Sequence, residues 1–280
     1  SGAVPTPQDT QAQFLDAVYR LYAPHKDEVS GIAMALPGFV DNRTGYVSNG
    51  GALLYNTATP VGQLLAEKCS CPVILENDGK AAAMAELANG ALKGCCNAAV
   101  FIIGTGVGGG IIANGQLVRG VHFTAGEYSF VNTNAEAWDA PDQNMACQCS
   151  TSNLLKWYRA RKALPEDAPL DGRSFFAAAN AGEPEALEVL RRFCHAVAVQ
   201  IYNLTVLLDV EKVAIGGGIS KQPLLLESLR SAYDGLYASR AGQAYMEGLP
   251  RCQIVPCAFS SEANQVGIAA AYFEAMQKKC

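Results

Sequence analysis

Apolar side chains recur at helical spacing near the start of the chain. Within residues 8–23 they follow one another at intervals of three and four, at Phe14, Val18, Leu21 and Tyr22. Asp9 or Thr10 precedes them as a candidate N-cap. These intervals place the apolar side chains on one face of a helix, so the pattern predicts an amphipathic helix.

Strand and helix patterns then alternate over residues 31–92. An apolar run at 31–36 predicts a buried strand, and a Pro37-Gly38 turn and a short hairpin follow it. A helix at 59–69, a strand at 72–75 and an Ala-rich helix at 80–92 come next. Such alternation predicts an α/β fold with a parallel or mixed sheet.

The rest of the chain predicts a second lobe. Between residues 98 and 118, two strands rich in β-branched side chains flank a Gly-rich turn, and Asn114-Gly115 marks a second turn. Residues 150–206 are mostly helical, and strands follow at 212–215 and 252–259. We predict an N-terminal lobe at 1–92, joined by a C-terminal helix at 263–280, and a C-terminal lobe at 93–262.

Composition narrows the possible partners. The 280 residues are 50% hydrophobic, which is enough for two cores, and the formal charge is −5 with a pI near 5.3. The 21 Lys and Arg are scattered, so no basic stripe is available for nucleic acid. No apolar run reaches the roughly 18 residues of a membrane span, and the first residues do not resemble a signal peptide. We therefore expect a cytoplasmic protein that binds neither nucleic acid nor membrane.

The cysteines do not predict a metal site. The ten cysteines have irregular spacings, and several lie in apolar segments, so we expect reduced thiols. Cys147 and Cys149 form the closest approach to a metal signature. Zinc usually takes four ligands, and no second Cys or His pair completes this set.

Two Gly-rich loops are candidate ligand sites. Residues 104–110 lie between two strands, where glycines either let backbone N–H groups approach a phosphate or serve only a tight hairpin. Gly216, Gly217 and Gly218 follow a strand, where they either face a planar ligand or form an ordinary turn. Two such loops in one lobe favour a nucleotide cleft.

Acidic side chains mark a third candidate site. Asp78 lies between a strand and a helix, where it is either a helix cap or a ligand-binding residue. Capping needs only one polar side chain, and Glu76 and Asn77 precede Asp78, so the surplus favours a ligand site. Glu127 lies among apolar neighbours, where a carboxylate is costly unless it is solvated, paired or bound. Ser150 is a candidate N-cap for the helix that follows it.

The order of these motifs resembles the ROK family of repressors and sugar kinases, within the actin-like ATPase and sugar kinase superfamily. The matching segments are GIAMALPGFVDNRTGYV, PVILENDGKAAAMAE, FIIGTGVGGGIIANGQLVRG, FTAGEYSF and VAIGGGIS, followed by the Gly- and Ala-rich final helix. The resemblance implies two α/β lobes with a ribonuclease H-like core and a cleft in which a sugar meets ATP. It also implies a homodimer.

The resemblance assigns roles residue by residue. Asp78 falls on the catalytic base, and Asn77 and Glu127 fall on sugar ligands. The loop with Gly51 and Ala52 is similar to a substrate-binding loop of one branch of the family. The nucleotide residues implied are Gly104, Thr105 and Gly106 on a phosphate loop and Gly216, Gly217 and Gly218 on the adenosine side. Phosphoryl transfer to a hydroxyl needs a carboxylate and Mg²⁺, so ATP and Mg²⁺ are the expected cofactors.

The chain departs from the family pattern in three places. Ser129-Phe130 replaces Gly-His, and only Cys147 and Cys149 of the zinc loop are present, which is similar to the zinc-less branch that includes bacterial β-glucoside kinases. Lys156 stands near the place of a Glu that contacts sugar in many members. The Asp-x-Gly-Gly-Thr phosphate loop has no counterpart in the chain, and we expect a preceding segment to carry it.

Three functions remain open from the sequence. The first is ATP-dependent phosphorylation of a hexose, a hexosamine or a β-glucoside, with Asp78 as the base. The second is the sugar-sensing domain of a ROK transcriptional regulator, and the third is a sugar-binding relative without catalysis. The two nucleotide loops and Asp78 favour the kinase.

Overall fold

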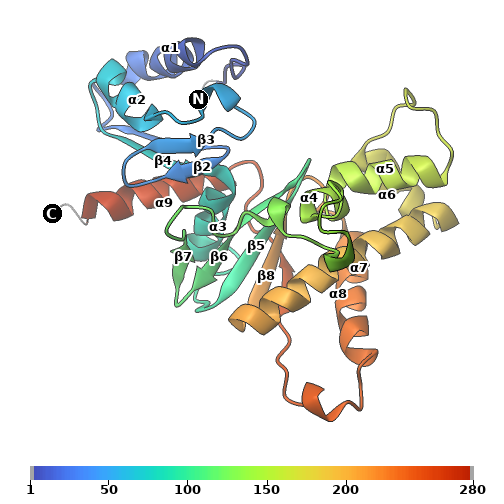
Figure 1. Cartoon of the computed structure of the whole chain (residues 1–280). Coiled ribbons are helices and arrows are strands. Elements are labelled where there is room, and N and C mark those ends of the chain that lie inside the picture. Colours follow the sequence, from blue (N-terminus) through green and yellow to red (C-terminus); the bar gives the residue numbers. More distant parts are fainter. Residues whose placement is uncertain (1–2, 278–280) are drawn as a thin grey trace.

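The N-terminal lobe is a small layered unit of strands and helices. The computed structural model describes residues 3–277. β1 (Ile32–Leu36) pairs in parallel with β4 (Val73–Asn77), and β2 (Phe39–Asp41) forms a hairpin with β3 (Tyr46–Asn49). Helices α1 (Gln11–Tyr22) and α2 (Val61–Cys69) lie over these strands (Figure 1). We use the name N-terminal lobe for these elements.

A five-stranded mixed sheet forms the second unit. The strand order is β7-β6-β5-β8-β9, in which β6 is antiparallel to β5 and β7, whereas β5, β8 and β9 are parallel. The strands are β5 (Ala98–Ile103), β6 (Val107–Ala113), β7 (Gln116–Val118), β8 (Lys212–Gly216) and β9 (Gln253–Pro256). The carboxyl ends of β5 and β8 therefore meet at one edge of the sheet.

Helices cover this sheet on both faces. One face packs against α5–α8 in a large core that includes Phe101 and Phe193, and the other face, which includes Val100, packs against α3 (Asp78–Asn89). The covering helices are α4 (Met145–Gln148), α5 (Thr151–Arg161), α6 (Gly172–Asn180), α7 (Pro184–Leu208) and α8 (Pro223–Ala238). A strand covered on both faces needs apolar side chains at every position, which explains the run AAVFII in β5. We use the name C-terminal lobe for this sheet and α4–α8.

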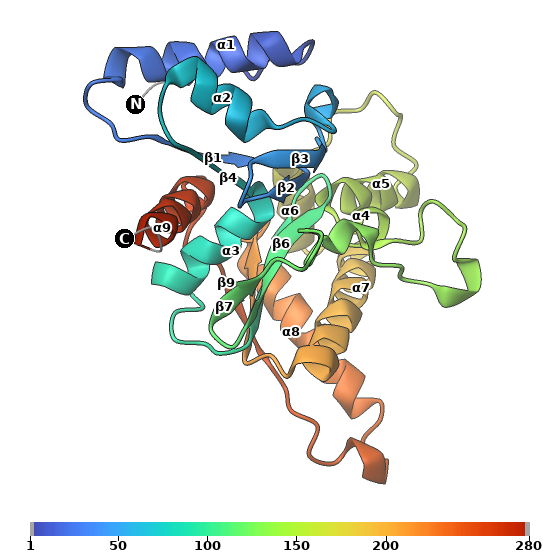
Figure 2. The same ribbon diagram turned by 60° about the vertical axis from the view of Figure 1, so that its left-hand side comes forward.

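Helices α3 and α9 (Ala263–Gln277) lie together between the two lobes. α9 packs against α3, β1 and β4, so the last helix lies beside the N-terminal lobe (Figure 2). A Cβ atom on Gly267 would lie 1.7 Å from the carbonyl oxygen of Ala81, so only glycine permits this approach of the two helices. Every residue of α3 from Gly79 to Glu86 is buried, which leaves this helix no polar face along that stretch.

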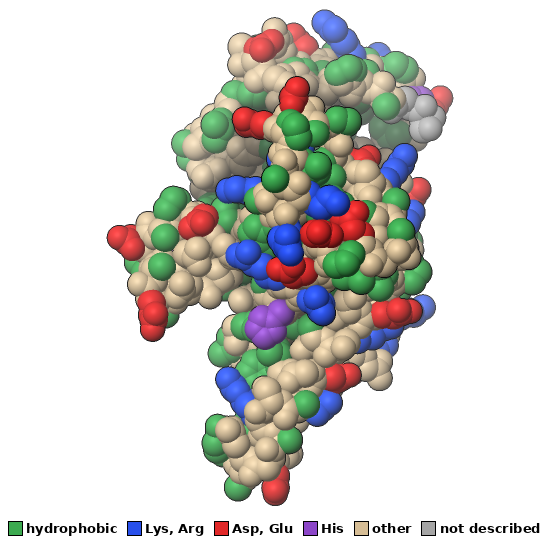
Figure 3. Space-filling view, turned by 90° about the vertical axis from the view of Figure 1, so that its right-hand side faces the viewer, with side chains coloured by type: hydrophobic (Ala, Val, Ile, Leu, Met, Phe, Trp, Pro, Cys, Tyr) green, Lys and Arg blue, Asp and Glu red, His purple; other side chains and the backbone are tan. Residues whose placement is uncertain are grey.

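Short 3₁₀ turns complete the secondary structure: Ala23–His25, Leu54–Asn56, Tyr128–Phe130, Ala135–Ala137 and Ala244–Met246. Within residues 3–277, no helix is long and apolar enough to span a bilayer. On the face shown in Figure 3, Lys and Arg side chains are interspersed with Asp and Glu side chains rather than gathered in one stripe.

Most predicted elements are present, with one instructive shift. Thr10 caps α1, and Asn114 and Gly115 both have positive φ angles in the β6–β7 turn, as the Asn-Gly pair predicts. β4, however, continues two residues beyond Leu75 to Asn77, and α3 begins at Asp78. The predicted division of the lobes at residue 92 stays a prediction.

Candidate functional site

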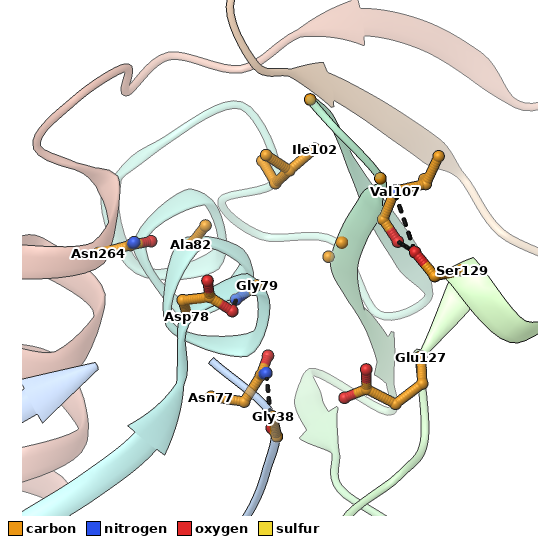
Figure 4. Close-up of a pocket in the computed structure, with 15 residues that line it drawn as sticks. Gly38, Asn77, Asp78, Gly79, Ala82, Ile102, Val107, Glu127, Ser129 and Asn264 are labelled. Atoms are coloured by element: carbon orange, nitrogen blue, oxygen red, sulfur yellow. Dashed lines mark hydrogen bonds between the residues drawn. The ribbon is translucent and has the colours of Figure 1, made fainter. Parts of the chain in front are cut away.

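A cavity of about 290 Å³ opens where α3, the β5–β6 hairpin and the loop after β7 meet. Its polar side chains are Asn77, Asp78, Glu127, Ser129 and Asn264, and much of the remaining lining is glycine backbone. Figure 4 shows Asp78 on one side of the cavity and Glu127 on the other. The chain segments that carry these two carboxylates are separated by three strands in the sequence, and the fold brings them together.

Asp78 is the first residue of α3 and directly follows a parallel strand. Its Oδ1 accepts a hydrogen bond from the Gly79 N–H at 2.8 Å, and its Oδ2 has no hydrogen-bond partner in the described part of the chain. Asp78 keeps exposed surface, but desolvation by the atoms around it raises the pKa of its carboxyl above the ordinary value, and the Gly79 hydrogen bond and the Lys80 charge oppose this only in part. A carboxylate with a raised pKa and a free oxygen can accept a proton from a bound hydroxyl.

Asn77, rather than Asp78, caps helix α3. The Asn77 Oδ1 accepts a hydrogen bond from the Lys80 N–H at 3.0 Å, and the Asn77 Nδ2 donates to the Gly38 carbonyl at 2.9 Å. The alternative reading of Asp78 as the cap is therefore wrong, and its carboxylate is free for another role. Each polar atom of the Asn77 side chain keeps one hydrogen-bonding position open, because an amide oxygen accepts two bonds and an amide nitrogen donates two.

Glu127 is held by a buried lysine. Lys80 Nζ lies 2.8 Å from Glu127 Oε1, and the Lys80 side chain is 1% exposed, whereas that of Glu127 is 21% exposed. Glu127 Oε2 has no hydrogen-bond partner among residues 3–277. The carboxylate is thus paired and only partly exposed to solvent, and one oxygen remains for a ligand.

Glu76, for which the sequence predicted no role, belongs to a second buried ion pair. Glu76 is fully buried, and its Oε2 accepts a hydrogen bond from Arg119 Nε at 2.7 Å. Its Oε1 accepts the Asn77 N–H at 3.0 Å. Since Arg119 follows β7, this pair ties the end of β4 to the C-terminal lobe.

The Gly-rich loop at 104–106 is the turn of the β5–β6 hairpin, and Gly104 and Gly106 line the cavity. Ser129 Oγ accepts from the Val107 N–H and donates to the Val107 carbonyl, both at 3.1 Å, which anchors the end of the turn. The N–H groups of Thr105 and Gly106 have no acceptor among the described residues. The free Gly106 N–H lies at the cavity, and a backbone donor in such a turn is what an anionic ligand requires.

Other predicted site residues lie outside the lining of this cavity. Gly216 lies opposite Ile102 in the parallel β5–β8 pair, so the loop that begins there adjoins the β5–β6 turn. Gly217 has a φ of +97°, and a Cβ atom there would lie 2.1 Å from the Ile103 carbonyl oxygen. Gly218 follows in the same loop. Both predicted nucleotide loops therefore occupy neighbouring strand ends, although Gly216, Gly217 and Gly218 do not line the cavity.

Gly51, Ala52 and Thr105 are also displaced from the cavity. A Cβ atom on Gly51 would lie 2.9 Å from the backbone nitrogen of Gly38, which does line the cavity, and Ala52 is exposed. Thr105 lines a separate cavity beside α4 and α5. The roles of these three residues stay predictions.

Cys147 and Cys149 are free thiols in the structure. Cys149 is buried in the large core, and burial raises its pKa to about 12, so the thiolate that a metal requires is disfavoured. Cys147 is half-buried. Among the described residues, no group of three or more His, Cys, Asp and Glu side chains is placed to hold a metal ion.

A family model described as the ROK family matches residues 1–275 of this chain. The chain belongs to the ROK family. A β-glucoside kinase from Listeria innocua is 30% identical over 214 residues, which cover 76% of this chain and 73% of that protein. A glucokinase from Halalkalibacterium halodurans is 31% identical over 224 residues, covering 72% and 66% of the two chains.

A solved ROK family protein from Streptococcus pneumoniae, in complex with sucrose, has the same fold. Its TM-score with this chain is 0.84 at 27% identity, and the match covers 99% of this chain and 90% of that one. The two-lobed fold of the actin-like ATPase and sugar kinase superfamily, predicted from the sequence, is therefore confirmed.

Three site residues of this ROK chain were missed by the sequence reading: Lys80, Ser129 as a loop anchor, and Asn264. Arg119, which pairs with Glu76 outside the cavity lining, was also missed. A signal for Lys80 exists in retrospect, because a lysine inside the Ala-rich run GKAAAMA has no polar helix face to occupy. Such a lysine must reach a buried acid. Asn264 carries no comparable signal, because its proximity to the cavity depends on how α9 packs.

Proposed function

We propose that this ROK family chain is an ATP-dependent sugar kinase with Asp78 as the general base. The observation that carries the proposal is the carboxylate of Asp78, which keeps one oxygen without a partner and has a raised pKa, in a cavity that it shares with Glu127 and with the free Gly106 N–H of the β5–β6 turn. The names of the curated relatives, a β-glucoside kinase and a glucokinase, support the same reaction class.

The reaction needs one proton acceptor. A sugar hydroxyl hydrogen-bonded to Asp78 Oδ2 attacks the terminal phosphorus of ATP, the bond from that phosphorus to the ADP oxygen breaks, and the hydroxyl proton passes to Asp78. The raised pKa of Asp78 makes its carboxylate a better proton acceptor than an aspartate with an ordinary pKa. The product pair is a sugar phosphate and ADP.

The sugar would lie between the two carboxylates. Glu127 Oε2 and the free positions of Asn77 and Asp78 are mostly acceptors, which suit the donating hydroxyls of a neutral sugar. A hexose, a hexosamine or a β-glucoside meets this requirement, and the loop with Gly51 and Ala52 would adjoin the sugar through Gly38. Closure of the lobes would exclude water, which otherwise competes for the phosphoryl group.

The nucleotide phosphates would meet the turn at Gly104, Thr105 and Gly106, and the adenosine would lie along Gly216, Gly217 and Gly218. Mg²⁺ typically takes phosphate oxygens, waters and one or two carboxylates, so a cavity with few carboxylates fits an ion that enters with the nucleotide. When bound, it would neutralise charge on the transferring phosphoryl group. A homodimer, a cytoplasmic location, and lobes at 1–92 with 263–280 and at 93–262 belong to the same proposal and are supported by the family resemblance.

The test is an ADP-release assay on the full-length protein with D-glucose, N-acetyl-D-glucosamine and methyl β-D-glucoside as acceptors. The proposal expects ADP release that depends on at least one of these sugars, with a phosphate ester found on that sugar by mass spectrometry. Binding of a sugar by calorimetry without any sugar-dependent ADP release would contradict the kinase and favour a sensing or non-catalytic role.

A further inference from the structure

We propose that Lys80 is a positioning residue for sugar binding: it fixes the carboxylate of Glu127 relative to Asp78. The inference rests on the proposed kinase function. Lys80 lies in the first turn of α3, two residues after Asp78, and its Nζ contacts Glu127 Oε1 at 2.8 Å. One lysine thus links the helix that carries the base to the loop that carries the opposite carboxylate.

Lys80 acts through Glu127 rather than on a ligand. Lysines in kinase sites often contact phosphates, but Lys80 is 1% exposed and does not line the cavity, whereas Glu127 does. Reaching a phosphate would require Lys80 to leave its buried position and its acid. Lys80 therefore affects a ligand in the cavity only through the position of the Glu127 carboxylate.

The local structure around Glu127 does little to fix its side chain, so the contact with Lys80 matters for its position. Glu127 ends a segment without helix or strand after β7, and the adjoining Gly126 has a φ of +79°. Its side chain has no other hydrogen-bond partner among the described residues. A free glutamate side chain loses roughly 1.5–2 kcal/mol of rotamer entropy when a ligand immobilises it, and a preformed ion pair removes much of that cost.

Burying a lysine also costs free energy that burying an apolar side chain of similar volume does not. Lys80 occupies a helix of alanines, where a charge is unfavourable unless it is paired, and an apolar side chain of similar volume often serves stability equally well. Stability alone thus gives no reason for a lysine here. Orientation of a ligand-binding carboxylate does give one.

The pair also defines which group of the sugar Glu127 contacts. With Oε1 engaged by Lys80, Glu127 presents Oε2 as an acceptor, so the facing group of the sugar must donate a hydrogen bond. A hydroxyl meets this condition, whereas a sugar with a deoxy position there displaces water and leaves the Oε2 oxygen unpaired. Lys80 would thereby contribute to selection of a sugar with a free hydroxyl at that position.

The test compares Lys80→Met with wild-type enzyme, using whichever of D-glucose, N-acetyl-D-glucosamine and methyl β-D-glucoside the wild type phosphorylates most efficiently. Loss of one charge-assisted hydrogen bond typically costs about tenfold or more in binding, so the sugar KM and the calorimetric Kd should rise by about that factor. We expect kcat to stay within about threefold and the KM for ATP within about twofold, since Asp78 and the nucleotide loops are intact.

Three further variants distinguish a positioning role of Lys80 from a general loosening of the fold. Arg119→Met breaks the other buried ion pair, whose members do not line the cavity, and should leave the sugar KM within about twofold of wild type. Lys80→Arg keeps the charge and should recover part of the lost affinity. Adding Lys80→Met to Glu127→Gln should change the sugar KM by less than about twofold, because Lys80 acts only through Glu127.

The outcomes are distinct from those of the function test. If the wild type phosphorylates no sugar, the proposed function fails first. If the wild type is active and Lys80→Met has an unchanged sugar KM, or if Arg119→Met raises it equally, the inference on Lys80 is wrong. A fully additive effect of the two changes in the double variant would likewise overturn it.

Discussion

At the scale of single residues, the raised pKa of Asp78 makes the stability of the protein depend on pH. Desolvation of the carboxyl raises this pKa, which means that the folded protein holds the charged form at a cost. The folded-state pKa lies above the unfolded one, so between these two values the folded protein binds more protons than the unfolded chain. Stability therefore falls as the pH rises through that interval, and the loss persists at neutral pH.

Asp78→Asn should consequently be more stable than wild type at pH 7. The asparagine has the same shape, keeps an oxygen for the Gly79 N–H and carries no charge at any pH. The difference in Tm should shrink as the pH falls toward the ordinary aspartate pKa of about 3.9, where the wild-type carboxyl also becomes neutral. Thermal unfolding of both proteins between pH 4 and pH 8 measures this, and a less stable variant at pH 7 would refute the account of the pKa.

The site residues differ in how far the sequence could predict them. Asp78 and Glu127 could be predicted as site residues because a carboxylate beside an apolar run is costly unless it has a partner or a ligand. The basic partners of Glu127 and Glu76 were not predictable, because Lys80 contacts Glu127 across 47 positions and Arg119 contacts Glu76 across 43. Contacts over such separations follow from the packing of α3 between the lobes, which no local pattern describes.

At the scale of elements, α3 approaches β6 more closely than side chains allow. A Cβ atom on Gly79 would lie 2.5 Å from the backbone nitrogen of Gly109, in strand β6. This approach brings Asp78 beside the β5–β6 turn. Glycine is otherwise a poor helix residue, so its presence here reflects the contact rather than helix propensity.

Gly79→Ala should therefore destabilise the protein by about 1–3 kcal/mol, the usual cost of overpacking, and should lower kinase activity by moving Asp78. Gly235→Ala in α8 is the matched control, because nothing lies within 4 Å of a Cβ atom there. Helix propensity should make that control more stable by about 0.5–1 kcal/mol. Urea unfolding compares them, and equal shifts in both variants would exclude the close approach as the cause.

The other end of α3 binds both connections between the lobes. Glu86 is fully buried, and its carboxylate accepts hydrogen bonds from the backbone N–H groups of Ala91, Ala258 and Phe259 at 2.8, 3.0 and 2.9 Å. Ala91 begins the path into β5, and Ala258 and Phe259 lead from β9 to α9. One side chain thus holds the two chain crossings together.

Glu86→Gln should lower the free energy of unfolding by about 1–3 kcal/mol, because an amide NH₂ group would face backbone N–H donors and leave at least one unpaired. The exposed Glu227→Gln in α8 is the control and should change stability by less than about 0.5 kcal/mol. Guanidinium unfolding of the two variants is the measurement. Equal stability of Glu86→Gln and wild type would show that these hydrogen bonds contribute nothing.

At the scale of the whole molecule, the order of strands and helices was largely readable from the sequence. Buried strands such as β5 have continuous apolar runs, and Asn114-Gly115 marks the β6–β7 turn. The boundary of β4 was placed two residues early because Glu76 and Asn77 are polar, and polar residues normally end a buried strand. Both side chains are satisfied by tertiary partners, which is why the strand continues.

The lobes contribute different halves of the site. Asn77 and Asp78 come from the junction of β4 and α3, and Glu127 and the β5–β6 turn come from the C-terminal lobe. Phe39 and Phe130 also meet edge to face across the lobes, with ring centroids 5.9 Å apart. A site divided in this way assembles only when the lobes are correctly placed.

The measurement that tests the central claim most directly is phosphoryl transfer by Asp78→Asn, paired with calorimetric sugar binding. The account predicts that the variant binds the acceptor sugar within about threefold of wild type and loses kcat by about 10²–10⁴-fold, because the shape remains and the proton acceptor is gone. Wild-type turnover by Asp78→Asn would contradict the account.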